Sequence, residues 1–194
     1  MNHVARAFLL LPVLLLGAVP AHAAPPSPLP RDSAYQLPLR LTDANGARFD
    51  WRTLRGKPRV VSMFYTSCQF VCPLIVDSGK AIEKALTPAQ QQRLGIVLVS
   101  MDPAHDTPAA LQHVVSERRL DPARWTLASP PEDDVRAVAG VLGIRYRKLA
   151  DGGFNHSTAL VLLDADGRIL ARTEQVGSQA DPEFLAAVRQ AVAR

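Results

Sequence analysis

Hydrophobic residues follow two patterns along the chain. Continuous apolar runs rich in β-branched residues are typical of buried strands, and they occur at 59–65 and 95–101. Shorter apolar stretches bounded by turn sequences predict further strands at 37–41, 47–49, 125–128, 145–149, 157–163 and 168–173. Helical spacing and capping residues predict helices at 72–86, 88–93, 108–119, 131–142 and 181–192. Thr107 and Asp181 stand as N-caps, each followed by proline at the first helical position.

The order of these elements indicates one α/β domain over residues 37–194. Strands that alternate with helices predict a central, mostly parallel sheet flanked by helices. A closing strand–strand–helix unit is typical of the second half of a thioredoxin-like fold. Residues 37–49, with the turn sequence Asp-Ala-Asn-Gly between the two strands, predict an N-terminal β-hairpin extension.

The first 36 residues are expected to lie outside this domain. Arg6 precedes an apolar run at 7–19, and Ala23 ends a small-x-small sequence, which together predict a signal peptide over 1–23 and a periplasmic mature protein. The run is short for a membrane span, although an uncleaved inner-membrane anchor remains the alternative. Residues 24–36 are Pro-rich and predict a flexible lead-in.

Charge gives little guide to partners. The formal net charge is +4 and the chain has 22 Lys and Arg against 18 Asp and Glu. The cations are scattered, with short clusters at 118–119 and 145–148 that are typical of solvated faces. No nucleic-acid partner is expected, whereas a positive surface can assist docking to an acidic partner.

The chemistry of the chain lies in its two cysteines. Two are too few for a disulfide framework or a four-thiolate zinc site. Cys68 and Cys72 fall where a predicted strand meets a predicted helix, and a helix N-terminus stabilises thiolates. Their spacing allows a disulfide or a shared metal ion, and a third, imidazole ligand would favour Cu(I) or Cu(II). A purely structural disulfide is the alternative, but so short a loop makes it a poor stabiliser. In an exported protein the pair needs a thiol reductant to stay reduced.

Three histidines remain after the predicted signal peptide. His113 lies within a predicted amphipathic helix, where it is expected to face solvent or pack. His105 follows a predicted strand and is a weak ligand candidate. His156 begins a predicted strand after a flexible Gly-Gly-Phe-Asn stretch, so its ring can reach a neighbouring loop.

Three ordered motifs resemble the SCO/SenC copper-chaperone family. Phe-Tyr-Thr-Ser-Cys at 64–68, followed by Cys-Pro at 72–73, resembles its F-x-Y-T-x-C-x-x-x-C-P signature with one residue fewer between Phe and Tyr. Residues 99–108 resemble its S-x-D-P-x-x-D-T-P loop, and 155–157 resemble its D-H-S segment. The resemblance runs from about residue 37 to the C-terminus.

This resemblance implies a thioredoxin-like copper chaperone with Cys68, Cys72 and His156 as ligands and Asp102 as an outer-shell group. It implies delivery of copper to, or reduction of, the binuclear copper site of cytochrome c oxidase subunit II or a similar protein, with a copper donor chaperone as a further partner. Asn155 stands where the family usually has an acid, and His105 where it usually has Arg. These departures leave the ligands intact and bear on affinity and docking.

Two enzymatic alternatives remain. A thiol–disulfide oxidoreductase would attack with Cys68, resolve with Cys72, and need no histidine. A peroxidase on the same fold would use one activated thiol beside Thr66.

Overall fold

The computed structural model describes residues 27–68, 72–150 and 152–193, with only the backbone of Cys72. The predicted signal peptide over 1–23 and the residues between the two cysteines lie outside these ranges. Within them, no helix has the length and hydrophobicity needed to cross a membrane.

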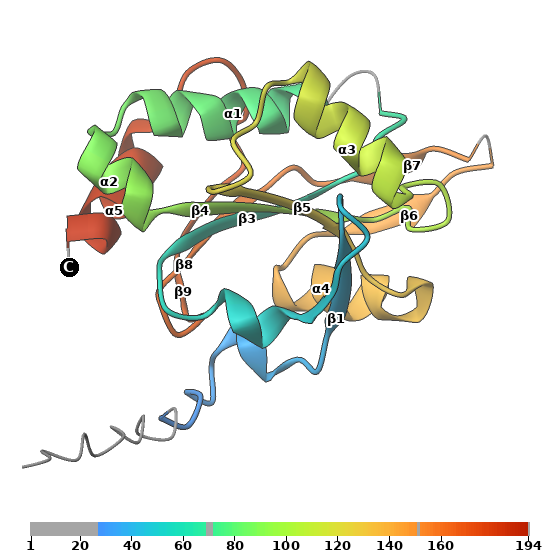
Figure 1. Ribbon diagram of the computed structural model, residues 1–194, viewed down its shortest axis with the longest axis horizontal. Coiled ribbons are helices and arrows are strands. Elements are labelled where there is room, and N and C mark those ends of the chain that lie inside the picture. The colour runs from blue at the N-terminus through green and yellow to red at the C-terminus, as the bar shows by residue number, and fades with distance from the viewer. Residues whose placement is uncertain (1–26, 69–71, 151, 194) are drawn as a thin grey trace, which may run out of the picture.

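A single mixed sheet forms the centre of the described fold (Figure 1). Its strand order is β2-β1-β5-β4-β3-β8-β9, with bounds β1 Arg40–Asp43, β2 Arg48–Asp50, β3 Arg59–Phe64, β4 Gly95–Ser100, β5 Trp125–Ser129, β8 Leu160–Leu163 and β9 Ile169–Thr173. The pairs β3–β4 and β4–β5 are parallel, and the β1–β2 hairpin and strands β8 and β9 join antiparallel at either side. The predicted α/β thioredoxin-like fold with an N-terminal hairpin is confirmed.

The central strands are buried because helices cover both faces of the sheet. The helices are α1 Cys72–Lys84, α2 Pro88–Arg93, α3 Pro108–Glu117, α4 Val135–Val141 and α5 Pro182–Ala193. Figure 1 shows α1 and α3 on one face and α4 on the other. Strand β4 is buried at every position, as its continuous apolar sequence predicts. The caps agree as well, since the Thr107 hydroxyl accepts a hydrogen bond from the Ala110 amide.

Helix α1 approaches the sheet unusually closely at Gly79. A Cβ atom at this position would collide with the indole ring of Trp125 on β5. The same indole donates through Nε1 to Glu83 Oε2 at 2.8 Å. The lack of a side chain at Gly79 leaves space for the ring under the helix, and the hydrogen bond to Glu83 fixes its position.

The structure corrects three expectations. Part of the expected flexible lead-in is folded, because Ala34–Gln36 form a 3-10 helix and Tyr35 is only 1% exposed. The predicted helix at 131–142 begins as a 3-10 turn, Glu132–Asp134, before α4. His156 does not begin the long strand. It ends β7 (Phe154–His156), which pairs with β6 (Tyr146–Lys148) in a separate two-stranded sheet.

Candidate metal centre

The cysteine motif occupies the predicted junction between strand and helix. Strand β3 ends at Phe64 and α1 begins at Cys72. The Cys68 amide donates to the Tyr65 carbonyl at 3.3 Å, which makes a turn directly after the strand. The Cys68 side chain is partly buried against the core. A thiol in the turn and a second cysteine at the first helical residue place the motif at the positive end of a helix of 13 residues.

The carboxylate of Asp106 anchors this turn from the neighbouring loop. Its Oδ1 accepts from the Thr66 amide at 3.0 Å and from the Thr66 hydroxyl at 2.6 Å, while its Oδ2 accepts from the Ser100 hydroxyl at 2.5 Å. Asp106 is 1% exposed. Burial raises the pKa of this carboxyl group, and the hydrogen bonds from Ser100 and Thr66 oppose that rise. Asp106 therefore ties the segment two residues before Cys68 to the end of β4.

Tyr65 connects the cysteine turn to His156. Its ring lies edge-on to the ring of Phe154, with centroids 5.1 Å apart, and edge-on to the imidazole of His156 at 6.0 Å. Tyr65 is three residues before Cys68, and His156 is 88 residues after it. The small β6–β7 sheet thus brings the late histidine beside the cysteine turn.

The imidazole of His156 is held in one tautomer. Its Nδ1 lies 3.2 Å from the Ser157 carbonyl oxygen, and a carbonyl only accepts, so this hydrogen bond requires the proton on Nδ1. The Nε2 lone pair is then the one that can bind a metal. Burial lowers the pKa of His156, against the opposing effect of that hydrogen bond. Burial therefore favours the neutral form of this half-buried imidazole, which is the form that binds metals.

The described side chains alone do not complete a metal site. They contain no group of three or more His, Cys, Asp or Glu placed to hold one ion, and the side chain of Cys72 lies outside the description. The set Cys68, Cys72 and His156 therefore stays a prediction. The donor chemistry fits copper, because thiolate and imidazole are its good ligands.

The other sequence candidates have different surroundings. His113 is exposed and lies 3.3 Å from Glu117 on the next helical turn. Asp102 is buried, and its Oδ2 lies 2.8 Å from Nδ1 of the exposed His105. The Asp102 carboxylate therefore hydrogen-bonds the imidazole of His105. The Ser100 hydroxyl, which donates to Asp106, also accepts from the Asp102 amide at 2.9 Å.

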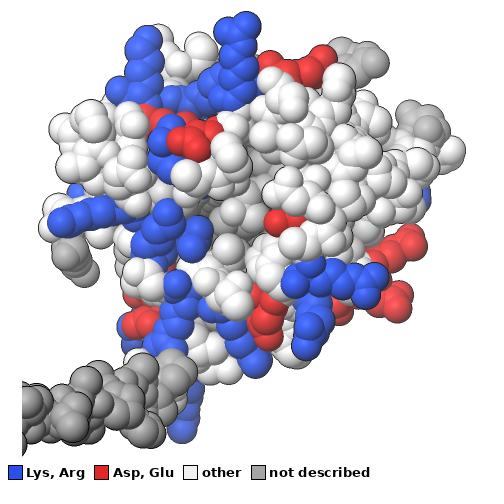
Figure 2. Space-filling model, viewed as in Figure 1, with Lys and Arg blue, Asp and Glu red and all other residues white. Residues whose placement is uncertain are grey.

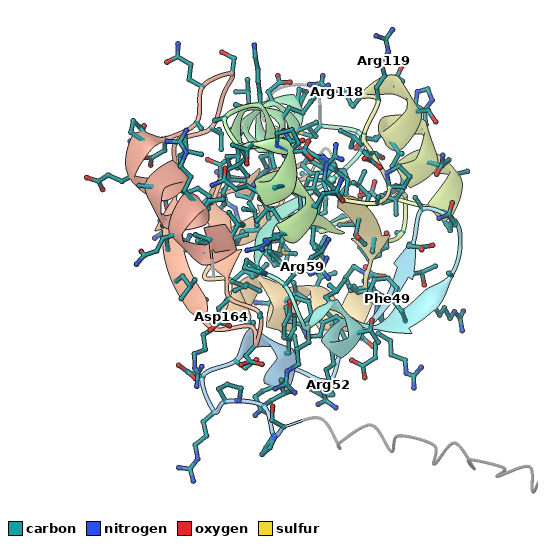
Figure 3. All side chains as sticks on the ribbon, turned by 60° about the vertical axis from the view of Figure 1, so that its left-hand side comes forward. Phe49, Arg52, Arg59, Arg118, Arg119 and Asp164 are labelled. Carbon is teal, nitrogen blue, oxygen red and sulfur yellow. The ribbon has the colours of Figure 1, made fainter. Side chains whose placement is uncertain are left out.

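A cavity of about 200 Å³ opens beside Cys68. Pro73 and Val76 of α1 line one side, and Val114, Glu117 and Arg118 at the end of α3 line the other. Arg118 pairs with Asp77 of α1. In Figure 3 Arg118 lies against α1 while Arg119 projects away from the molecule. The cysteine turn is therefore reached through a cavity with an apolar wall and a charged rim.

Comparison with known proteins settles the family. The SCO1/SenC family matches residues 28–193. The chain belongs to this family. Among solved structures, a candidate electron transfer protein of Aquifex aeolicus superimposes with a TM-score of 0.71 at 25% identity, over 84% of this chain and 94% of that one. Bradyrhizobium japonicum ScoI, solved with copper bound, gives a TM-score of 0.65 at 24% identity, over 79% and 97% of the two chains. The latter likeness speaks for the fold.

Curated relatives match over part of their length. A candidate copper-binding protein of Stutzerimonas stutzeri is 27% identical over 145 residues, which are 73% of this chain and 69% of that protein. The mitochondrial SCO2 protein of Saccharomyces cerevisiae is 27% identical over 139 residues, 69% of this chain but only 45% of that protein.

Two contributors to the site escape sequence reasoning. Asp106 belongs to the Asp-Thr-Pro motif, but only the folded loop shows its carboxylate on Thr66. Tyr65 belongs to the cysteine motif, but its contact with His156 depends on the pairing of β6 with β7. That hairpin is short and polar, so the pattern of apolar residues does not predict it.

Proposed function

We propose that this SCO1/SenC protein binds copper between Cys68, Cys72 and His156 and delivers it to the binuclear copper site of cytochrome c oxidase subunit II or a similar exported protein. The observation that carries the proposal is the contact between Tyr65 and His156. This contact supports the proposal, because Tyr65 stands three residues before Cys68 and the hydrogen bond at Nδ1 leaves Nε2 of His156 as the atom that could bind a metal. The likeness to the copper-binding protein of Stutzerimonas stutzeri supports the choice of metal.

Some residues would bind copper directly, and others would hold those ligands in position. The thiolates of Cys68 and Cys72 and the Nε2 atom of His156 would provide three ligands for Cu(I), and Cu(II) would need a further ligand such as water. Asp106 holds the turn that carries Cys68, and Ser157 holds the tautomer of His156. Transfer would proceed by ligand exchange with thiolates of the recipient, reached over the partly exposed Cys68. Export to the periplasm is part of this proposal, as is a thiol reductant that keeps the pair reduced.

Copper titration of the reduced protein without residues 1–23 tests the proposal. We expect one Cu(I) per chain and a loss of affinity of at least about tenfold in His156→Ala, because outer-shell partners alone contribute that much to metal affinity. The matched control is His113→Ala, an exposed histidine on α3, which should bind as the parent does. Equal affinity in His156→Ala, or in Cys68→Ser combined with Cys72→Ser, would refute the ligand set.

A thiol–disulfide oxidoreductase is the second candidate, favoured by the cavity beside Cys68 and the helix that begins at Cys72. The Cys68 thiolate would attack a target disulfide, forming a mixed disulfide and releasing one target thiolate. The Cys72 thiolate would then attack Cys68 Sγ, releasing the second target thiolate and leaving the chain oxidised by two electrons. A reductant thiol would restore the pair.

Trapping separates the two functions. In the oxidoreductase, Cys72→Ser accumulates the mixed disulfide and His156→Ala retains full activity in cells. In the copper chaperone, His156→Ala fails to restore copper-site assembly. Peroxide consumption by the reduced protein would instead support a peroxidase.

A further inference from the structure

A run of cations lies on the strand that pairs with the His156 strand. Arg145, Arg147 and Lys148 are exposed on or next to β6. None of them forms an ion pair with any residue in the described part of the chain. Most cations on the face shown in Figure 2 lie in separate groups with acidic side chains among them. Many other cations of the described residues also lack an ion pair, and Lys148 lies over the Phe154 ring, so what marks this run is its position on the strand paired with that of His156.

The strand register puts this charge next to the proposed ligand. Tyr146 lies opposite His156, and Arg147 lies opposite the neutral Asn155. A cavity of about 390 Å³ is lined by Arg145, Tyr146, Arg147, Asn155, His156 and Ser157. It contains two guanidinium groups and no carboxylate among the described residues. Side chains alternate along a strand, so Arg147 shares one face of the hairpin with Asn155, and His156 shares the other with Tyr146. A negatively charged group in this cavity would therefore meet Arg147 opposite the residue that precedes the proposed ligand.

A second cavity adds to the positive charge. It has a volume of about 450 Å³, lies along the same β6–β7 hairpin, and is lined by Arg136 of α4 as well as by Arg147 and Lys148. Its acids are Glu132 and Asp102, two against the three cations. Cations thus exceed acids here too. Arg136, Arg145, Arg147 and Lys148 together are called the β6 surface below.

We propose that the β6 surface docks an acidic face of the protein that exchanges copper at His156. This inference rests on the proposed function, and it names the charge of the partner. Ligand exchange requires the partner to lie against His156, and the surface beside that residue is positive. Opposite charge on the partner would speed encounter and fix its orientation. The occupant is a protein and not a bilayer, because exchange of copper at His156 needs ligand atoms of the partner beside this surface.

The test uses two synthetic peptides that differ only in charge. Each contains two cysteines separated by three residues, flanked by four Asp in one peptide and four Asn in the other. Fluorescence anisotropy with serine in place of the peptide cysteines measures binding to the copper-free chain. At low salt we expect the Asp peptide to bind about tenfold more tightly than the Asn peptide. This difference should vanish at roughly 0.5 M salt, because added salt screens the attraction between exposed charges. Cu(I) transfer to the cysteine forms should follow the same order.

Matched charge reversals locate the contact. Arg147→Glu should remove the advantage of the Asp peptide, whereas Lys84→Glu should keep it. Lys84 is exposed in the last turn of α1, so the two variants change the net charge equally. Both should bind Cu(I) in the absence of peptide as the parent does, which shows that neither variant disturbs the metal site.

Several outcomes would overturn the docking surface. One is equal binding of the Asp and Asn peptides, and another is an equal loss of Asp-peptide binding in Arg147→Glu and Lys84→Glu. A third is binding of the chain to vesicles with 30% anionic lipid that Arg147→Glu abolishes while it leaves peptide binding intact. Failure of the chain to bind Cu(I), with Asp-peptide binding at β6 retained, would refute the proposed function and support the surface.

Discussion

Replacement of Asp106 should loosen the cysteine turn and destabilise the fold together. In Asp106→Ala, three donors lose their acceptor: the Thr66 amide, the Thr66 hydroxyl and the Ser100 hydroxyl. An orphaned buried donor costs about 1–3 kcal/mol. Ser100 is fully buried, whereas Thr66 is partly exposed and can recruit water. We therefore expect a loss of about 2–4 kcal/mol in the free energy of unfolding, below the sum of three full penalties.

Asp106→Asn separates hydrogen bonding from charge. The amide oxygen keeps both bonds from Thr66, and its NH₂ group faces Ser100, whose hydroxyl can turn to accept. Charge-assisted bonds become neutral ones, but the cost of burying a charge disappears, so a loss of about 1 kcal/mol or less is expected at neutral pH. Urea unfolding measures both values, and Asp133→Asn, at an exposed position in the 3-10 turn before α4, is the control.

Copper affinity gives the second readout. Asp106→Ala should bind Cu(I) less tightly than Asp106→Asn under conditions where both are folded, since only the alanine variant releases Thr66 near Cys68. A destabilisation under about 0.5 kcal/mol in Asp106→Ala, equal to that of Asp133→Asn, would refute the anchoring role.

The same carboxyl group should give stability a pH dependence. Burial raises its pKa in the folded state above the ordinary value of an unfolded Asp. The folded protein therefore binds this proton more tightly. The associated stability is fully present below the unfolded pKa and is lost as pH rises through the folded pKa. In a pH series of urea unfolding, subtraction of the Asp106→Asn curve should leave this downward slope with rising pH, and a difference curve that is flat or rises would contradict it.

Two further predictions concern packing. Gly79→Ala should destabilise by about 1–3 kcal/mol, because its Cβ would collide with Trp125, whereas Gly140→Ala, with open space around it in α4, should be neutral or stabilising by up to about 1 kcal/mol in thermal unfolding. Tyr65→Leu should lose about 1–2 kcal/mol and bind Cu(I) several-fold more weakly than Tyr65→Phe, which keeps the edge contact with His156. Equal copper affinity in the two Tyr65 variants would show that the ring does not position the imidazole.

Much of the fold could be predicted from local pattern. The apolar runs at 59–65 and 95–101 have the length and β-branched content of buried strands, and Thr107-Pro108 marks a helix start, so β3, β4 and α3 follow from sequence. The position of the cysteines follows as well, since a strand, a turn and a proline-bearing helix start are consecutive in the chain. Three spaced motifs sufficed to indicate the family, which the SCO1/SenC match confirms.

The sequence-based predictions that were wrong concern segments whose structure depends on contacts with other parts of the chain. The Pro-rich sequence before 37 looks mobile, yet Tyr35 is buried with its ring edge-on to Trp51, centroids 5.4 Å apart. His156 reads as the start of a strand because polarity and glycine precede it, but its backbone pairs with Tyr146.

By itself the sequence indicated the residues that are proposed to carry the chemistry: two thiols at a helix start, from their spacing, and a late histidine, from resemblance to the family. Only the tertiary structure decided what surrounds them. Asp106 reaches Thr66 because β3 and β4 are adjacent and parallel, so that the loops at their ends meet. His156 lies against Tyr65 because a hairpin of its own returns it there. Neither contact has a local signature, since each depends on side chains brought together from 40 or more residues apart.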